Sequence, residues 1–327
     1  MKLCTFDLPD GGRHIGAVID AQRLVDLTAT GLAIFQDMLA LIDAGDPGLD
    51  AARQAIKEAR VVRNIAEVRY AAALPQPRQM RDFLCFEKHF RQARANRYLF
   101  AGTNSAAAAK VGSTPFSGAD MERDPAKVEI PAIWYQEPIY YKCNRFSVVG
   151  TGTDVINPRY CKMLDYELEF AAIVGKGGAN IHKDQAREHI FGYCIFNDFS
   201  ARDQQMREMS GSLGPSKGKD FDTGNAIGPW LVTPDELPTG CHGLNIQSRL
   251  NGQVMQNANT KDFLWGIAET IMLITECMTL EPGDVVITGT PAGVGYARNP
   301  PVFMKAGDIC EIEIESIGVL RNTIVDE

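Results

Sequence analysis

The chain has 327 residues, of which 45% are hydrophobic and 23% are charged, and its formal net charge is −8. This balance is typical of a folded protein with a large core or two domains, and it excludes disordered and collagen-like chains. No apolar run approaches the ~18 residues that span a bilayer, and no signal-peptide pattern follows Met1, so we expect a cytoplasmic protein with no membrane partner. Net acidity with scattered Lys and Arg argues against a nucleic-acid partner.

The cysteines are spread along the chain without any close pair. A structural zinc site or a redox dithiol needs such pairs, and a disulfide framework is typical of shorter secreted chains. We therefore expect most of the eight to be small buried side chains in a reducing compartment: Cys4, Cys85, Cys143, Cys161, Cys194, Cys241, Cys277 and Cys310.

The first 75 residues read as a small α+β domain. Strands are expected at 3–8 and 14–20, and helices at 32–44 and 47–60. Pro75 and Pro77 then interrupt any regular element, because proline lacks a backbone donor and restricts its predecessor. We expect a domain boundary there, which gives domains at 1–75 and 76–327.

The rest of the chain predicts a β-rich, mostly antiparallel α+β domain. A small, polar, turn-rich stretch at 101–126 is expected to be a long surface loop, either a plain insertion or a lid. Short runs with strand character follow at 139–141, 166–174, 194–197, 230–233, 245–250, 284–288 and 309–314. Helical runs are fewer, at 183–190, 201–209 and 263–277.

Carboxylates in the strand-like stretch LDYELEF could bind a metal. Glu167 and Glu169 are two positions apart, so on a strand they share one face and can converge on a hard cation such as Mg²⁺, Mn²⁺ or Ca²⁺. A solvated polar face would give that same alternation. Asp198, at the end of an apolar run, could add a third oxygen ligand or could close a turn on its own backbone.

Two other side chains could take part in chemistry. His89 follows Glu87 by two residues and Asp82 by seven, and it could act as a general base, although a lone histidine is often structural. Lys219 could provide a point charge against a carboxylate or an enolate, or it could be a solvated surface lysine.

Six ordered segments together resemble the fumarylacetoacetate hydrolase family. They are RDFLCFEKH, LDYELEFAAIVGKGG, GYCIFNDFSARDQQ, SKGKDFDTGNAIGPWLVT, LNGQVMQNANTKD and LEPGDVVITGTPAGVG, and they span 81–295. The resemblance implies a mixed β-sandwich roll, a homodimer and one divalent cation, Mg²⁺ or Mn²⁺ with Ca²⁺ as a further option.

The same resemblance implies roles for individual residues. The metal carboxylates would be Glu167, Glu169 and Asp198, with Asp82 as an additional acidic ligand. His89 would be the catalytic base and Lys219 a catalytic cation, while the substrate-binding side chains would be Arg202, Gln205 and Thr290. Some members pair the histidine with a Glu three residues later, but Gln92 stands there, so Glu87 is expected to take that place.

The activity that follows from the resemblance is hydrolysis of a C–C bond in an acylpyruvate or 1,3-diketo acid. The alternatives that use the same centre are decarboxylation of an oxaloacetate-like acid and isomerisation of a 2-oxo acid. A binding module without catalysis would retain the fold and the metal and would turn over no 2-oxo acid.

Overall fold

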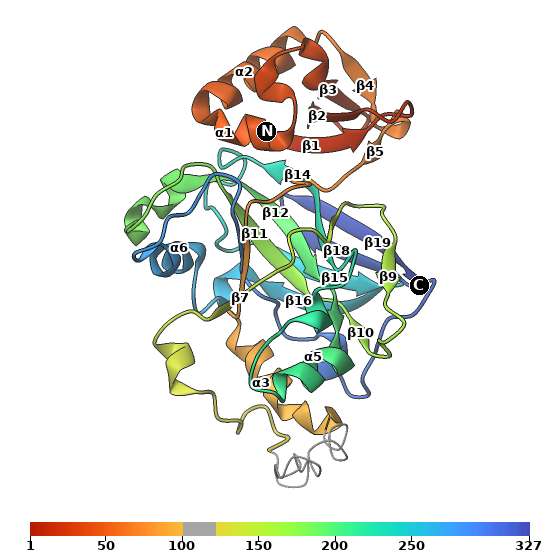
Figure 1. Ribbon diagram of the computed structural model, residues 1–327, viewed down its shortest axis with the longest axis vertical. Helices are drawn as coiled ribbons and strands as arrows, with labels where there is room; N and C mark the ends of the chain where they lie inside the picture. Colours follow the sequence, from red (N-terminus) through yellow and green to blue (C-terminus); the bar gives the residue numbers. More distant parts are fainter. Residues whose placement is uncertain (101–121) are drawn as a thin grey trace.

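The computed structural model describes residues 1–100 and 122–327, and these include most of the elements that the sequence predicts (Figure 1). The stretch 101–126, expected to be a surface loop or a lid, lies mostly outside the described residues. The N-terminal part contains five strands, which pair antiparallel, and two α-helices. Its elements are β1 (Lys2–Asp7), β2 (Arg13–Val18), β3 (Arg23–Asp26), α1 (Met38–Asp43), α2 (Gly45–Glu58), β4 (Val62–Asn64) and β5 (Arg69–Tyr70).

A long mixed sheet continues from this N-terminal part into the rest of the molecule. Its path is β4-β3-β2-β1-β14-β12-β11-β17-β6-β7. The strands beyond β1 are β6 (Met80–Phe83), β7 (Tyr140–Lys142), β11 (Leu168–Val174), β12 (Ile190–Asp198), β14 (Asn225–Val232) and β17 (Val285–Ile287). Antiparallel pairing of Lys2 with Val232 joins the two parts, so the sheet crosses the boundary expected at residue 75. The division into domains stays a prediction.

The centre of this sheet is buried on both faces. Every residue of β11 is buried, and so are all but the first of β12. Both strands are rich in β-branched and aromatic residues, which pack well on a pleated surface. Phe170, Phe196 and Ile195 are fully inaccessible. The strands that carry the acidic motifs are therefore held in the interior.

A second sheet of five strands packs beside the first. Its order is β16-β15-β18-β19-β9, made of β9 (Val155–Asn157), β15 (Asn245–Leu250), β16 (Gln253–Asn259), β18 (Ile309–Ile314) and β19 (Gly318–Asp326). Residues of both sheets belong to one buried cluster, including Leu168 and Ile312. The predicted β-rich α+β fold is confirmed.

Among residues 76–100 and 122–327, the α-helices are α3 (Glu87–Ala95), α5 (Arg202–Met209) and α6 (Ile267–Thr275). Figure 1 shows α3 and α5 at the end of the molecule opposite the N-terminal strands. The expected helix at 183–190 is a 3₁₀ helix, Lys183–His189, and the expected helix at 32–44 is divided into a 3₁₀ turn and α1. No helix was expected at 87–95, and α3 carries His89.

Candidate active site

Three acidic side chains meet at one end of the large sheet because their strands are neighbours. Asp82 is near the end of β6, Asp198 ends β12, and Glu169 is near the start of β11, which runs antiparallel to β12. Strand β17 lies between β11 and β6 and pairs its Ile287 with Asp82. These registers bring the three carboxylates together although they are far apart in sequence.

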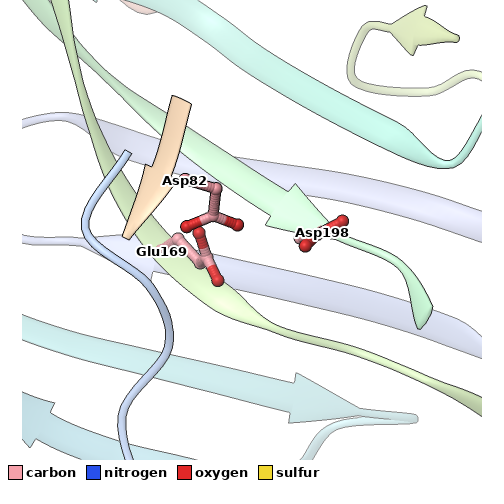
Figure 2. Close-up of side chains that lie close together, drawn as sticks. All are labelled: Asp82, Glu169 and Asp198. Carbon is pink, nitrogen blue, oxygen red and sulfur yellow. The ribbon is translucent and has the colours of Figure 1, made fainter. Parts of the chain in front are cut away.

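Figure 2 shows that the side chains of Asp82, Glu169 and Asp198 lie close together, and one oxygen from each lies within 4.8 Å of the others. All three side chains are buried, with exposed fractions of 3% or less. In the part of the chain that the structure describes, Asp82 Oδ1, Glu169 Oε2 and Asp198 Oδ1 have no hydrogen-bond partner. Buried carboxylate oxygens are normally satisfied, so open oxygens that converge fit a hard divalent cation.

The electrostatics of this carboxylate cluster agree with that fit. Burial, and then the charges of Asp82 and Glu167, raise the pKa of Glu169 well above its usual range. Burial and the charge of Asp198 likewise raise the pKa of Asp82 well above its usual range. A cation between them would remove the cost of holding these groups ionised.

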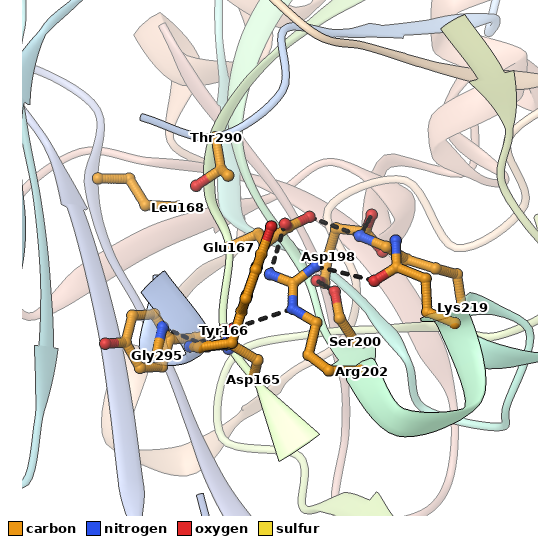
Figure 3. A network of polar contacts seen from close by, with 12 residues as sticks. Asp165, Tyr166, Glu167, Leu168, Asp198, Ser200, Arg202, Lys219, Thr290 and Gly295 are labelled. Atoms are coloured by element: carbon orange, nitrogen blue, oxygen red, sulfur yellow. Dashed lines mark hydrogen bonds and ion pairs between the residues drawn. The ribbon is translucent and has the colours of Figure 1, made fainter. Parts of the chain in front are cut away.

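Glu167 lies beside the cluster instead of in it, since basic side chains occupy both of its oxygens (Figure 3). Arg202 Nη2 donates to Glu167 Oε1 over 2.7 Å, and Lys219 Nζ donates to the other oxygen. Burial opposes ionisation of Glu167, but Arg202 and Lys219 outweigh it and lower its pKa to about 2. The three carboxylates whose oxygens converge are thus Asp82, Glu169 and Asp198, and the assignment of Glu167 as a metal ligand stays a prediction.

Lys219 is buried and links the two carboxylate groups. Its ammonium bonds Glu167 and Asp198, while Tyr141 on β7 also donates to Asp198. Burial would lower the pKa of Lys219, yet Asp198 and Glu167 raise it, so the side chain stays charged. Lys219 is therefore no solvated surface lysine.

Arg202 is oriented by a residue that the sequence analysis missed. Asp165 is fully buried and accepts from Arg202 Nε over 2.9 Å and from the backbone N–H groups of Gly295 and Tyr296. Arg202 also donates to Gln205 Oε1 over 3.0 Å and stacks on the Tyr296 ring. Asp165 directly precedes the YELE segment, but only long-range contacts reveal its role.

His89 lies on the first turn of α3 and is 5% exposed. Burial, opposed by Glu167, lowers its pKa to about 4, so the imidazole is neutral near pH 7. Its Nδ1 has no hydrogen-bond partner. No carboxylate hydrogen-bonds His89 within the described residues.

The expected pairing of Glu87 with His89 is wrong in this structure. The Glu87 carboxylate accepts from Arg91 Nε over 2.7 Å and from the Tyr135 hydroxyl over 2.9 Å, both outside the carboxylate cluster. Residues two apart on a helix point to different sides, so α3 directs Glu87 away from His89.

A cavity of about 280 Å³ opens onto this group of residues. The predicted site residues that line it are Asp82, His89, Glu167, Glu169, Arg202, Gln205, Lys219 and Thr290. The Thr290 hydroxyl accepts from Gln256 Nε2 over 2.8 Å, which fixes the loop after β17. Of the ten predicted site residues, Glu87 and Asp198 do not line the cavity, but Asp198 belongs to the carboxylate cluster with Asp82 and Glu169, which do.

This fold and this cavity define a β-rich protein with a buried acidic centre suited to a hard cation. The family described as "Fumarylacetoacetate (FAA) hydrolase C-terminal" matches residues 82–325, and the chain belongs to this family.

Curated relatives over the full length are oxaloacetate tautomerases. The mitochondrial oxaloacetate tautomerase FAHD2A of Homo sapiens is 31% identical over 327 residues, covering 99% of this chain and 92% of that protein. The oxaloacetate tautomerase YisK of Bacillus subtilis is 30% identical and covers 99% and 100%. The Xenopus laevis tautomerase fahd2 is 40% identical over 190 residues, 58% of this chain and 59% of that protein.

Among solved structures, a fumarylacetoacetate hydrolase from Exiguobacterium antarcticum is similar with a TM-score of 0.73 and 28% identity, and the match covers 100% of both chains. A maleylpyruvate hydrolase from Sphingobium shares the fold with a TM-score of 0.72 at 23% identity. Within residues 1–100 and 122–327, no helix has the length and apolar character needed to cross a membrane.

Proposed function

We propose that this chain catalyses keto–enol interconversion of a short 2-oxo acid of the oxaloacetate type. The observation that carries the proposal is that open carboxylate oxygens and a neutral His89, which no carboxylate of the described residues hydrogen-bonds, meet at one cavity. Full-length similarity to oxaloacetate tautomerases supports it.

The carboxylates of Asp82, Glu169 and Asp198 would hold the divalent cation. Mg²⁺ and Mn²⁺ both suit an all-oxygen centre, and Ca²⁺ remains a further option. Such a cation would supply Lewis-acid polarisation of the 2-oxo group.

The residues of the chain account for the proton transfer. His89, neutral near pH 7, takes a proton from the carbon next to the 2-oxo group and returns it to the resulting enolate oxygen. No bond to carbon other than C–H breaks, and no water is consumed. Arg202 and Gln205 face the cavity and would orient the substrate carboxylate, with Thr290 on the opposite loop.

Hydrolysis of an acylpyruvate, our first expectation from the sequence, makes a further demand on His89. The imidazole would have to activate water, and a hydrogen-bonded carboxylate normally orients and stabilises a histidine in that role. Glu87 does not serve, because Arg91 and Tyr135 bind it. The match to a fumarylacetoacetate hydrolase structure keeps hydrolysis as the second candidate.

One experiment separates these activities. The purified protein, with Mn²⁺ or Mg²⁺ added, is mixed with oxaloacetate and with a panel of acylpyruvates, while enol absorbance and pyruvate release are followed together. Faster keto–enol equilibration of oxaloacetate without pyruvate is the expected result. Pyruvate from oxaloacetate would identify a decarboxylase, and pyruvate from an acylpyruvate a hydrolase.

Substitution of His89 tests its role in that assay. His89→Gln is expected to slow the interconversion about 10²–10⁴-fold, the usual contribution of a general base. His242→Gln is the matched control, because that histidine is exposed and distant in sequence from every predicted site residue. Equal rates in wild type and His89→Gln would refute the assignment of the base. The homodimer and the cytoplasmic location stay predictions.

A further inference from the structure

Two arginines lie next to each other along the wall of the cavity. Arg94 lies in the last turn of α3, and Arg97 begins the 3₁₀ helix that follows (Arg97–Phe100). Both line the cavity that contains His89. Neither makes a hydrogen bond or an ion pair within the described residues. The Arg94 guanidinium lies over the Phe90 ring, 5.8 Å from its centroid, and the charge of Glu129 acts on it against that of Arg97.

Other arginines near the site are paired. Arg91, on that helix, bonds Glu87, and buried Arg202 bonds Asp165 and Glu167. Arg94 is half-buried, and burial together with the charge of Arg97 lowers its pKa. Two neighbouring guanidinium groups that line a cavity and form no ion pair within the described residues attract an anion, and their planar donors match a carboxylate.

The position of Arg94 on α3 places it within reach of a substrate held near His89. Five residues on a helix correspond to a rise of about 7.5 Å and a turn of about 140°, so Arg94 and His89 do not share one helix face. Arg94 lies one turn after Phe90, with its guanidinium carbon 5.8 Å from the centroid of the Phe90 ring, and His89, Phe90 and Arg94 all line the cavity. The wall around it is largely apolar, including Phe90, Ala93 and Met206.

We infer that Arg94 and Arg97 bind the second carboxylate of a 2-oxo dicarboxylic acid and select such acids over 2-oxo monocarboxylic acids. This inference rests on the proposed function, because it assumes that the 2-oxo acid end is held at the carboxylate cluster. The cavity then has two charged ends, one for the 2-oxo acid group and one for the distal carboxylate.

Calorimetric titration of the Mn²⁺-saturated protein tests the inference without turnover. The probes are 3,3-difluoro-oxaloacetate, which has no C3 hydrogen and cannot enolise, 2-oxobutanoate, which lacks the distal carboxylate, and oxalate, which represents the 2-oxo acid end alone. The variants are Arg94→Gln, Arg97→Gln and the double variant. Lys88→Gln is the matched control, since Lys88 is exposed on α3 and removal of its charge is an equivalent change.

The wild type is expected to bind difluoro-oxaloacetate more tightly than 2-oxobutanoate. Each arginine variant should bind difluoro-oxaloacetate about tenfold to hundredfold more weakly than the wild type. This is the loss of affinity typical of one charge-assisted hydrogen bond. Oxalate affinity should stay within about twofold in every variant, and Lys88→Gln should match the wild type.

Two results would overturn the inference. One is equal affinity of the wild type for difluoro-oxaloacetate and 2-oxobutanoate, and the other is unchanged selectivity in the double variant. Loss of oxalate binding together with difluoro-oxaloacetate binding would also count against it, because that pattern indicates damage to the whole site. Failure of the proposed function has a different signature, in which the dicarboxylate binds selectively but oxaloacetate equilibrates at the uncatalysed rate.

Discussion

Replacing Glu169 by Gln should have opposite effects on stability with and without a divalent cation. Glu169 is 1% exposed, and its oxygen lies within 4.8 Å of those of Asp82 and Asp198. Without a cation, the substitution removes a buried charge that repels two others. With a cation, it removes a ligand. The metal-free variant should therefore be more stable than the metal-free wild type, and the order should reverse when metal is added.

The size of the gain follows from the spacing. Two unit charges 4.8 Å apart repel by roughly 3 kcal/mol at an effective dielectric constant of about 20. Lys219 offsets part of this, and partial protonation relieves more, so we expect a net gain of about 1–3 kcal/mol near pH 8. Metal at a hundred times its dissociation constant stabilises the wild type by about 2.7 kcal/mol.

The gain should also depend on pH. The folded-state pKa of Glu169 is raised, so the carboxyl group is protonated in both states at low pH and imposes no penalty there. The penalty grows as the pH rises above the ordinary carboxyl pKa towards the folded-state value, because only the unfolded chain ionises freely. The advantage of Glu169→Gln is therefore expected to increase with pH across that window.

Chemical unfolding after chelation, and again with Mn²⁺, measures both effects. Glu276→Gln is the matched control, because Glu276 is exposed and the change in side chain is identical. A metal-free variant that is less stable than the wild type would refute the argument from repulsion. An equal gain from Mn²⁺ in both proteins would refute Glu169 as a ligand.

Three further predictions concern residues around the cluster. Asp165→Asn should raise KM for oxaloacetate with unchanged Mn²⁺ affinity, because Asp165 orients Arg202; loss of Mn²⁺ binding in calorimetry would contradict this. Lys219→Met should cost about 3–5 kcal/mol of folding stability, because it leaves buried carboxylates unpaired, and Mn²⁺ should recover part of the loss in thermal unfolding. Gly289→Ala should cost more than about 1 kcal/mol, because Gly289 has a φ of 76° and an added Cβ would lie 2.1 Å from the Phe83 carbonyl oxygen; an unchanged unfolding midpoint would disprove it.

The alternation of Glu167 and Glu169 was sufficient to predict acidic side chains on one strand face, but not their partners. Those partners come from β6, β12, α5 and the turn that carries Lys219, and only the folded sheet brings them together. Because Asp82 is far from Glu169 in sequence, only the family resemblance predicted it as an acidic ligand. The spacing of acidic residues in the sequence does not indicate which of them forms an ion pair with Arg202 and which has no basic partner.

The prediction for Glu87 failed at the level of local structure. On an extended segment, residues two apart share a face, so Glu87 and His89 would lie together. The segment is helical, and the i, i+4 neighbour of Glu87 is Arg91, which forms an ion pair with it. The segment is short, and isolated helices of this length are marginal, so contacts such as the packing of Phe90 on Trp134 stabilise it.

The distribution of counter-charges in the site explains which acids are available to a cation. Glu167 has both Arg202 and Lys219, and Asp198 has Lys219 and Tyr141 on one oxygen only. Asp82 and Glu169 have neither basic residue as a hydrogen-bond partner. A buried carboxylate without a basic partner lowers folding stability. This fold has two of them, Asp82 and Glu169, beside an open oxygen of Asp198, so we expect a bound ligand to offset the loss of stability. Arg202 and Lys219 thus neutralise Glu167, whereas the open oxygens of the carboxylate cluster are available to a divalent cation.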